Sequence, residues 1–415
     1  MRHYATLLHR FVGLALAGLL LLAGITGSIL VWYHELDEAF NPGVMRATAP
    51  VSGAQALGPL ALRERLLASN PGASINLVEL ERVPGAAAKF ILQQVDGAGQ
   101  TQYEEVFVDP YSAHIQGRRV AGKLSQFPLD LMPFIFELHF ALALGTTGTW
   151  VLGIAALLWT LDCFVGAFLT FPLRGRQGTP ASAHKGWPRR WTSAWKVRTG
   201  SAYKLTFDLH RAGGLWLWAI LFVIAWSAVG FNLQQAYRPV MEALFDHQDE
   251  LQRMPKTALA TGAPMGWEQA LTQGRLLMAR EAEQQGFSVL QERLMSFDAK
   301  RALYRLRVKS DRDLSGQKGN TSLYFDAVTG ERRALFLPTG RASGDTVSTW
   351  LFGLHMAQVW GLPFRIFITI TGIAVAMLST TGVLIWLRKR RGRVHADAQV
   401  QRQARHSAAL AGHRR

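Results

Sequence analysis

Two sequence patterns that contain histidine occur twice in this chain. A Leu-His-Arg-x-x-Gly-Leu motif occurs at residues 8–14 and again at 209–215. A Leu-His pair occurs at residues 138–139 and again at 354–355. A haem iron takes one axial ligand from each side of the macrocycle, and neutral imidazole is a suitable ligand. The histidines are therefore predicted to ligate two haem irons as facing pairs, His9 with His210 and His139 with His355. No Cys-x-x-Cys-His sequence is present, so both are expected to be non-covalent haem b.

The same histidines have a simpler interpretation. A histidine at a membrane boundary can be only an interfacial anchor, and an internal repeat makes the two pairs less independent. Glycines around them are expected to leave room for flat porphyrins, although close helix packing explains any single one equally well. These glycines are Gly13, Gly18, Gly24, Gly27, Gly153, Gly166, Gly213, Gly214, Gly372 and Gly382.

Apolar segments must position the histidines. Of 415 residues, 49% are hydrophobic and one is cysteine, which excludes a disordered or disulfide-stapled chain. Four apolar runs are each long enough for the roughly 20 residues that cross a bilayer core. They span residues 11–33, 150–171, 215–233 and 364–387. The first is longer than the apolar part of a cleavable signal, so it is expected to remain as a membrane helix.

The distribution of Lys and Arg predicts orientation. Basic residues crowd the loop at 172–212 and the segment after 387, and short basic loops stay in the cytosol. Both termini are therefore expected in the cytosol, and the segments 34–138 and 237–353 in the periplasm of a bacterial inner membrane. The net charge of +16 is explained by this topology and by anionic lipid, so a nucleic-acid partner is not expected.

Both outer segments are predicted to be α+β. Each has a helix, at 55–68 or 267–285, before three strands, at 74–81, 89–94 and 103–109, or at 288–296, 302–309 and 321–326. The same order of elements predicts a parallel internal duplication of one unit, in which an outer domain lies between two spans.

The fold class is thus a four-transmembrane-helix bundle with two periplasmic α+β domains. The expected boundaries are 1–36 for the first transmembrane helix, 37–125 for the first periplasmic domain, 126–173 for an interfacial helix and the second transmembrane helix, 174–205 for a basic cytosolic loop, 206–237 for the third transmembrane helix, 238–345 for the second periplasmic domain, 346–388 for an interfacial helix and the fourth transmembrane helix, and 389–415 for a basic cytosolic tail.

Helix length predicts a break after each outer histidine. A helix running from His139 to the end of the second span would be about 50 Å long, which is too long for the bilayer. Breaks are expected at 145–148 and 361–363, so that short amphipathic helices place His139 and His355 at the outer rim. His9 and His210 would face each other at the inner rim.

Three further features carry alternatives. Asp162, near the middle of the second span, is expected to be a proton relay or a charge partner near a cofactor, unless it only bonds a Ser or Thr of another span. His34 is expected to be interfacial, or to contact the outer cofactor. The basic pairs at 118–119 and 332–333 are expected to be solvated strand ends, or to attract an anionic chelate.

Over about residues 5–391 the chain resembles the PepSY-associated transmembrane family of bacterial inner-membrane proteins. The resemblance rests on the motif at 8–14, on Gly-Ile-Thr-Gly-Ser at 24–28, on Glu-Leu-Asp at 35–37 with Asn-Pro at 41–42, and on the residues at 354–361 and 381–387. It implies four spans and two periplasmic PepSY-like domains, and some members are ferrisiderophore reductases that carry electrons through two haems. The third run departs from the pattern, because Ser-Ala-Val-Gly at 227–230 replaces the Thr-Gly pair, so the two inner ligand environments need not be equal.

Two principal functions follow as hypotheses. The first is a haem-dependent ferric-chelate reductase that reduces a periplasmic ferric siderophore and releases iron. It needs a separate electron donor, a cytosolic flavoprotein or a quinol, because no nucleotide-binding Gly-rich motif follows a strand. The second is a haem-free PepSY membrane module that binds a peptide, a protease or a transporter partner. A small-solute permease is disfavoured, because no span is interrupted near its middle in both halves.

Overall fold

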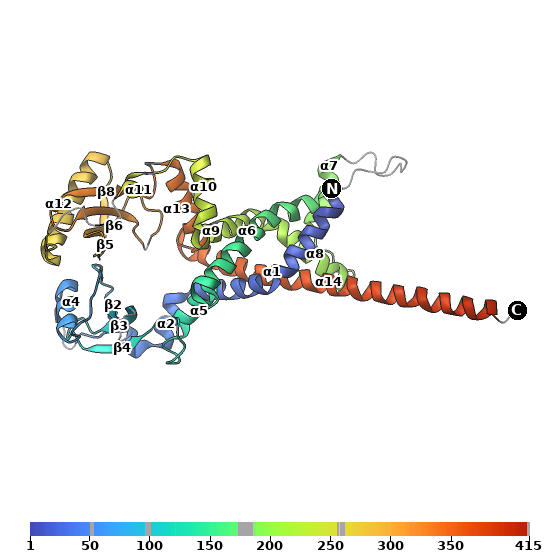
Figure 1. Cartoon of the computed structure of the whole chain (residues 1–415), viewed down its shortest axis with the longest axis horizontal. Helices are drawn as coiled ribbons and strands as arrows, with labels where there is room; N and C mark the ends of the chain where they lie inside the picture. Colours follow the sequence, from blue (N-terminus) through green and yellow to red (C-terminus); the bar gives the residue numbers. More distant parts are fainter. Residues whose placement is uncertain are drawn as a thin grey trace. The chain divides into compact units, whose positions relative to one another are not determined.

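The computed structural model describes residues 1–49, 54–95, 101–120, 122–172, 186–254, 257, 262–316 and 318–412 (Figure 1). Its parts fall into two compact units, one made of residues 1–28, 151–229 and 369–415 and one made of residues 29–150 and 230–368. The first unit is helical. The second contains both β-sheets, together with the ends of several long helices.

Three described helices are long and apolar enough to cross a membrane. They are α1 (Arg2–Leu30), α6 (Gly145–Thr170) and the apolar part of α14 (Gly361–Gly412). A fourth span is made by α8 (Ala202–Trp216) and α9 (Trp218–Asn232) if this bent pair is taken as one. The chain is therefore a multi-pass membrane protein.

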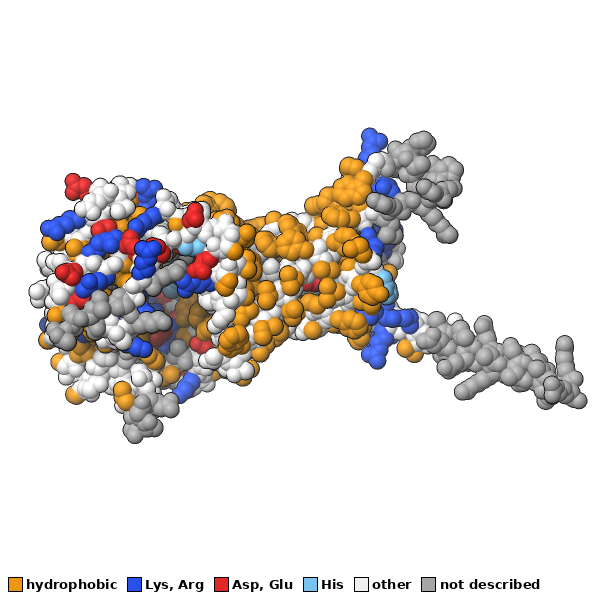
Figure 2. Space-filling model, turned by 45° about the horizontal axis from the view of Figure 1, so that its top comes forward, with side chains coloured by type: hydrophobic (Ala, Val, Ile, Leu, Met, Phe, Trp, Pro, Cys, Tyr) orange, Lys and Arg blue, Asp and Glu red, His pale blue; other side chains and the backbone are white. Residues whose placement is uncertain are grey.

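Apolar side chains on these helices face outward. On α6 a stripe of exposed residues recurs every three or four positions, as expected for a face that contacts lipid: Ile154, Leu158, Leu161, Phe164 and Phe168. Hydrophobic side chains cover the visible helical surface, and Lys and Arg gather at its end (Figure 2). Exposure of so large an apolar surface to water is unfavourable, which supports burial of these helices in a bilayer.

The third apolar run is bent. Helices α8 and α9 meet at Leu217 at an angle of 71°. Two consecutive glycines, Gly213 and Gly214, precede the bend, whereas α1 has Val12 and Gly13 at the corresponding positions and continues unbroken. Glycine weakens a helix because it adds backbone freedom, so the double glycine favours the break here.

Close helix packing explains some of the glycines. A Cβ on Gly24 of α1 would lie 2.5 Å from the carbonyl oxygen of Gly372 on α14, so neither position has room for a side chain. Ser28 donates a hydrogen bond to the Thr369 carbonyl at 3.0 Å across the same contact. By contrast, a Cβ on Gly13 or Gly18 would meet nothing within 4 Å.

The extramembrane region, residues 33–144 and 234–360, contains two antiparallel sheets. One has the order β2-β3-β4, and the other has the order β1-β5-β6-β7-β8. The strands are β1 (Leu77–Glu79), β2 (Ala88–Val95), β3 (Thr101–Val108), β4 (Ile115–Arg119), β5 (Val289–Asp298), β6 (Leu303–Ser310), β7 (Thr321–Asp326) and β8 (Arg332–Phe336). The helices are α2 (Tyr33–Phe40), α3 (Pro42–Met45), α4 (Pro59–Ala68), α5 (Leu131–Ala141), α10 (Gln234–Leu244), α11 (Glu250–Arg253), α12 (Trp267–Gln285) and α13 (Ser343–His355).

The two outer segments share one hydrophobic core. Strand β1 of the first segment pairs with β5 of the second, with Leu77 opposite Ser296. Fully buried residues from both segments, among them Leu66, Val78 and Leu306, belong to a single cluster. A small α+β segment buries only part of its apolar surface alone, so a shared core stabilises both.

The expected secondary structure of these segments is largely confirmed. The helix at 267–285 forms as predicted, and Gly286 ends it at a φ of 65°. The helix expected from residue 55 begins only at Pro59, because proline suits the first turn of a helix. The strand expected at 74–81 is shorter, and its partner β5 belongs to the second outer segment.

The chain breaks after both outer histidines, as helix length predicts. Helix α5 ends two residues past His139, and α13 ends at His355. The breaks lie slightly earlier than expected, because Gly145 and Gly361 are already the first residues of α6 and α14. Both glycines have positive φ, 56° and 63°, which permits the abrupt change of direction.

Candidate cofactor site between the membrane helices

The structure brings His9 of α1 and His210 of α8 together. Their ring centres lie 6.0 Å apart with the planes tilted by 56°, and both side chains are half-buried. At the first residue of α1, the Arg2 guanidinium donates hydrogen bonds to the carbonyls of Leu169 and Phe171, at 2.6 and 2.8 Å. These bonds join α1 to α6. The pairing joins residues that are 201 positions apart (210 − 9).

Helix α8 is held at its start. Ser201 caps it, accepting a hydrogen bond from the Lys204 N–H at 3.2 Å. Asp208 is fully buried and accepts hydrogen bonds from Arg198 and Arg211, each at 2.7 Å. These contacts fix the helical turn that carries His210.

Each inner histidine is held through its Nδ1 atom. Nδ1 of His9 lies 2.9 Å from the Asp162 carboxylate on α6. Nδ1 of His210 lies 2.9 Å from the Leu378 carbonyl and 3.2 Å from the Thr381 hydroxyl on α14. A partner at Nδ1 sets the tautomer and orients the ring, which leaves Nε2 as the metal-binding atom.

A glycine lies beside each of these rings. A Cβ on Gly166 of α6 would be 3.5 Å from Cε1 of His9, and a Cβ on Gly382 of α14 would be 3.2 Å from Cε1 of His210. The two glycines therefore leave space for the imidazole rings. The sequence alone did not distinguish this role from close packing of the helices.

The donor set fits a bis-histidine haem. Metal–imidazole nitrogen bonds are about 2 Å long, so one iron bonded to two facing imidazoles would hold the ring centres roughly 6 Å apart. The observed separation is 6.0 Å. Among the described residues no three His, Cys, Asp or Glu side chains form a metal-binding group, and two axial ligands are all that a haem needs from the chain.

The outer histidines occupy equivalent positions. His139 lies in the last turn of α5 and His355 in the last turn of α13, and both are half-buried. The His355 ring packs edge-on against Phe231 with centres 5.4 Å apart. The pairing of His139 with His355 across a second haem stays a prediction.

Asp162 is a charge partner of a predicted ligand. Its side chain is 11% exposed, and its contact is to His9 rather than to a Ser or Thr of another span. A carboxylate partner strengthens the electron donation of an imidazole, so this contact would make His9 a stronger ligand if it binds a metal.

The expectation that the two basic pairs are solvated strand ends, or attract an anionic chelate, is wrong for Arg119, whereas the other three arginines are partly exposed at strand ends and are paired with acids. Arg119 is 2% exposed, contacts Asp37 at 2.9 Å and Glu105 at 2.6 Å, and so joins α2 to β3 and β4. The other three pair with acids at 2.7 to 2.9 Å: Arg118 with Glu104, Arg332 with Glu281 and Glu250, and Arg333 with Asp326. In the sequence, the acidic residues of α2, β3 and α12 were the features that could have predicted these ion pairs.

His34 lies just past α1 and is exposed. Partial desolvation by neighbouring groups, followed by the positive charges of Lys318 and Lys89, lowers the pKa of His34. It therefore faces a part of the extramembrane region that is rich in cations.

The fold and the histidine site define a class, that of multi-pass membrane proteins whose helices carry histidines beside an extramembrane α+β region. The family model for the PepSY-associated TM region matches residues 6–389, and the chain belongs to this family. No curated protein matches the sequence significantly.

Proposed function

We propose that this protein is a two-haem electron carrier of the bacterial inner membrane that reduces a ferric siderophore in the periplasm. The observation that carries the proposal is the facing of His9 and His210 at a ring separation suited to one iron, with both Nδ1 atoms already held. The outer pair, His139 and His355, is assigned to the second haem by its repeated Leu-His pattern.

The residues around the inner pair have separate roles in this proposal. His9 and His210 hold the iron, and Asp162 and Thr381 fix the imidazoles, so that little reorganisation accompanies a change of charge. Haem, when bound, supplies one-electron transfer.

The overall reaction moves one electron to each ferric ion. A separate donor, a cytosolic flavoprotein or a membrane quinol, supplies the electron, and Fe(III) becomes Fe(II) without any bond of the organic ligand being broken. Hard oxygen donors hold Fe(II) less tightly than Fe(III), so iron is released.

A reduced-minus-oxidised absorbance spectrum with a pyridine haemochrome count on detergent-purified protein tests this function. We expect two b-type haems per chain. Absence of haem after expression with ample haem supply would overturn the proposal and favour a haem-free module that binds a peptide, a protease or a transporter.

A further inference from the structure

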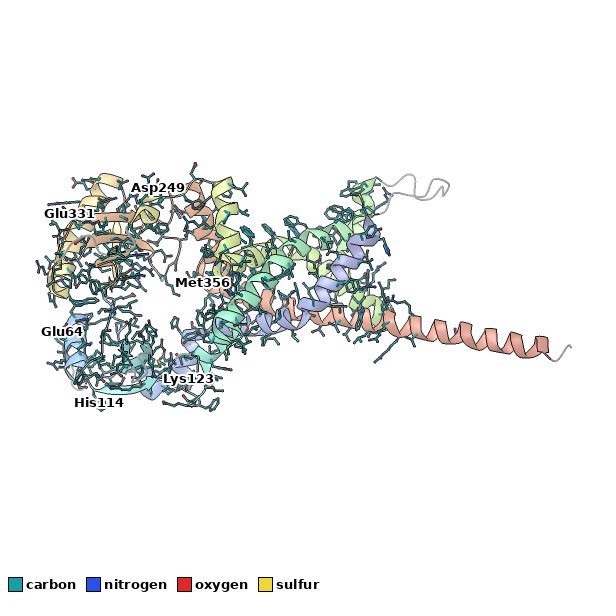
Figure 3. All side chains as sticks on the ribbon, in the orientation of Figure 1. Glu64, His114, Lys123, Asp249, Glu331 and Met356 are labelled. Atoms are coloured by element: carbon teal, nitrogen blue, oxygen red, sulfur yellow. The ribbon has the colours of Figure 1, made fainter. Side chains whose placement is uncertain are left out.

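A cavity of about 530 Å³ lies in the extramembrane region. Its walls come from the face of the five-stranded sheet that turns away from α12, from the loop between β6 and β7, and from helices α10 and α13. Met356, labelled in Figure 3, ends α13 and lines it. This volume lies in the range of small-molecule sites.

The sheet places one arginine in this cavity. On β6 the residues Leu306 and Val308 are buried in the core, and Gly274 of α12 packs against Leu306. Because successive side chains on a strand point to opposite faces, Arg307 projects from the other face, into the cavity. The opposing strand adds Ser322, directly across from Arg307.

Arg307 lacks a counter-charge. Among the residues that the structure describes, no carboxylate forms an ion pair with it, and its buried Nε has no hydrogen-bond partner. Asp313 is the carboxylate whose charge acts on Arg307, and it already accepts hydrogen bonds from Ser310, Asn320 and Thr321. The other cation of the cavity, Arg238, is paired with Glu242 at 2.6 Å.

One further cation, Arg305, lies near Arg307 on the same strand. Burial, followed by the positive charge of Arg305, lowers the pKa of Arg307. A half-buried cation without a partner is costly, so Arg307 favours an anion from solution, whereas the other charged side chains that line the cavity are already paired, Arg238 with Glu242 and Asp345 with His247.

The cavity also reaches the outer histidine. Phe231 lines it and packs against the His355 ring with centres 5.4 Å apart. Phe352 lies beside Phe231 at 4.6 Å and lines the same wall. A molecule bound here would therefore be separated from His355 by one aromatic ring.

We propose that this cavity binds a negatively charged ferric chelate with oxyanion groups, such as carboxylates, and that Arg307 contacts those oxygens. The electron supply to this chelate rests on the proposed function, whereas its binding does not. Asn320, Ser322 and Tyr324 add polar groups on the sheet side, which suits an oxygen-rich ligand.

Binding of gallium(III) citrate to the purified full chain, measured by isothermal titration calorimetry, tests the proposal, because Ga(III) does not undergo reduction at accessible potentials. We expect R307Q to weaken binding at least ten-fold and R307K to weaken it less. The matched control is R275Q, because Arg275 lies on α12 in an exposed pair with Glu292. The gallium complex of desferrioxamine B, which is cationic, should bind at least ten-fold more weakly than gallium citrate.

Unchanged gallium citrate binding in R307Q, or equal binding of the two complexes, would overturn the assignment. Loss of the fold would not imitate the expected result, because removing a half-buried charge that has no ion-pair partner among the described residues should leave the thermal unfolding midpoint of R307Q equal to or above that of the parent. If the protein binds gallium citrate but contains no haem, the proposed function is wrong and the anion site is retained. If it contains two haems but does not bind gallium citrate, the anion site is wrong and the proposed function is retained.

Discussion

Asp162 contacts His9 through both carboxylate oxygens, at 2.9 and 3.0 Å from the imidazole Nδ1. The facing ring, His210, has only neutral oxygens at its Nδ1, from Leu378 and Thr381. One imidazole therefore has a side-chain carboxyl group as its partner and the other does not. The two histidines differ in this way although α1 and α8 contain the same Leu-His-Arg-x-x-Gly-Leu motif.

Paired ligation predicts which haem each histidine variant loses. His9→Ala or His210→Ala should remove the inner haem and leave the outer one, and His139→Ala or His355→Ala should do the opposite. A pyridine haemochrome count should fall from two haems to one in each case. Full haem content in all four variants would contradict the ligand assignment.

Asp162→Asn should keep the haem content and raise the inner haem potential. The carboxylate charge favours Fe(III), so its removal should raise the potential by roughly 50–100 mV, about 60 mV corresponding to a tenfold change in a one-electron equilibrium. Spectroelectrochemical titration measures this. Thr160→Val is the control, because Thr160 is buried on the same helix and bonds only the Ala156 carbonyl.

A large side chain at Gly166 should displace the inner ligand. A Cβ there lies 3.5 Å from the His9 ring, so Gly166→Ala should be tolerated, whereas Gly166→Phe should push the imidazole aside and abolish inner haem binding. Gly18→Phe on α1 is the matched control, since a Cβ at that position meets nothing within 4 Å. Normal spectra in Gly166→Phe would show that the ring does not need this space.

Arg119→Met should strongly destabilise the extramembrane region. It leaves the carboxylates of Asp37 and Glu105 buried without their cation, a loss of about 3–5 kcal/mol. The neighbouring Arg118→Met removes a half-exposed pair with Glu104 and should cost less than about 1 kcal/mol. Thermal unfolding of the two variants in detergent compares them, and equal effects would refute the buried role of Arg119.

Acid should destabilise the extramembrane region below about pH 4. Burial raises the pKa of Asp326, but hydrogen bonding from the Thr329 N–H and the Arg333 guanidinium outweighs it, so the pKa falls below its ordinary value. A lowered pKa in the folded state gives stability that is complete above the unfolded value, about 3.9, and is lost as pH falls through the folded value. Unfolding midpoints between pH 3 and 8 measure this, and Asp326→Asn should flatten the acid limb. A stability maximum below pH 4 would contradict it.

Local patterns in the sequence determined much of this protein. The apolar runs, the four histidines with their repeated neighbours, the helix at 267–285 and the breaks after His139 and His355 all follow from spacing over a few turns of chain. Such features depend on residues near in sequence, which hydrophobic periodicity and helix length report directly.

Only the tertiary structure decided which distant residues meet. Asp162 contacts His9 across 153 positions, β1 joins the sheet of the other segment, and Arg119 is enclosed by acids from α2 and β3. The pleat of β6 turns Arg307 away from the core, and within the described part of the chain no carboxylate forms an ion pair with it. These outcomes depend on how whole elements pack, and packing is set by the summed burial of many side chains, which no local spacing encodes.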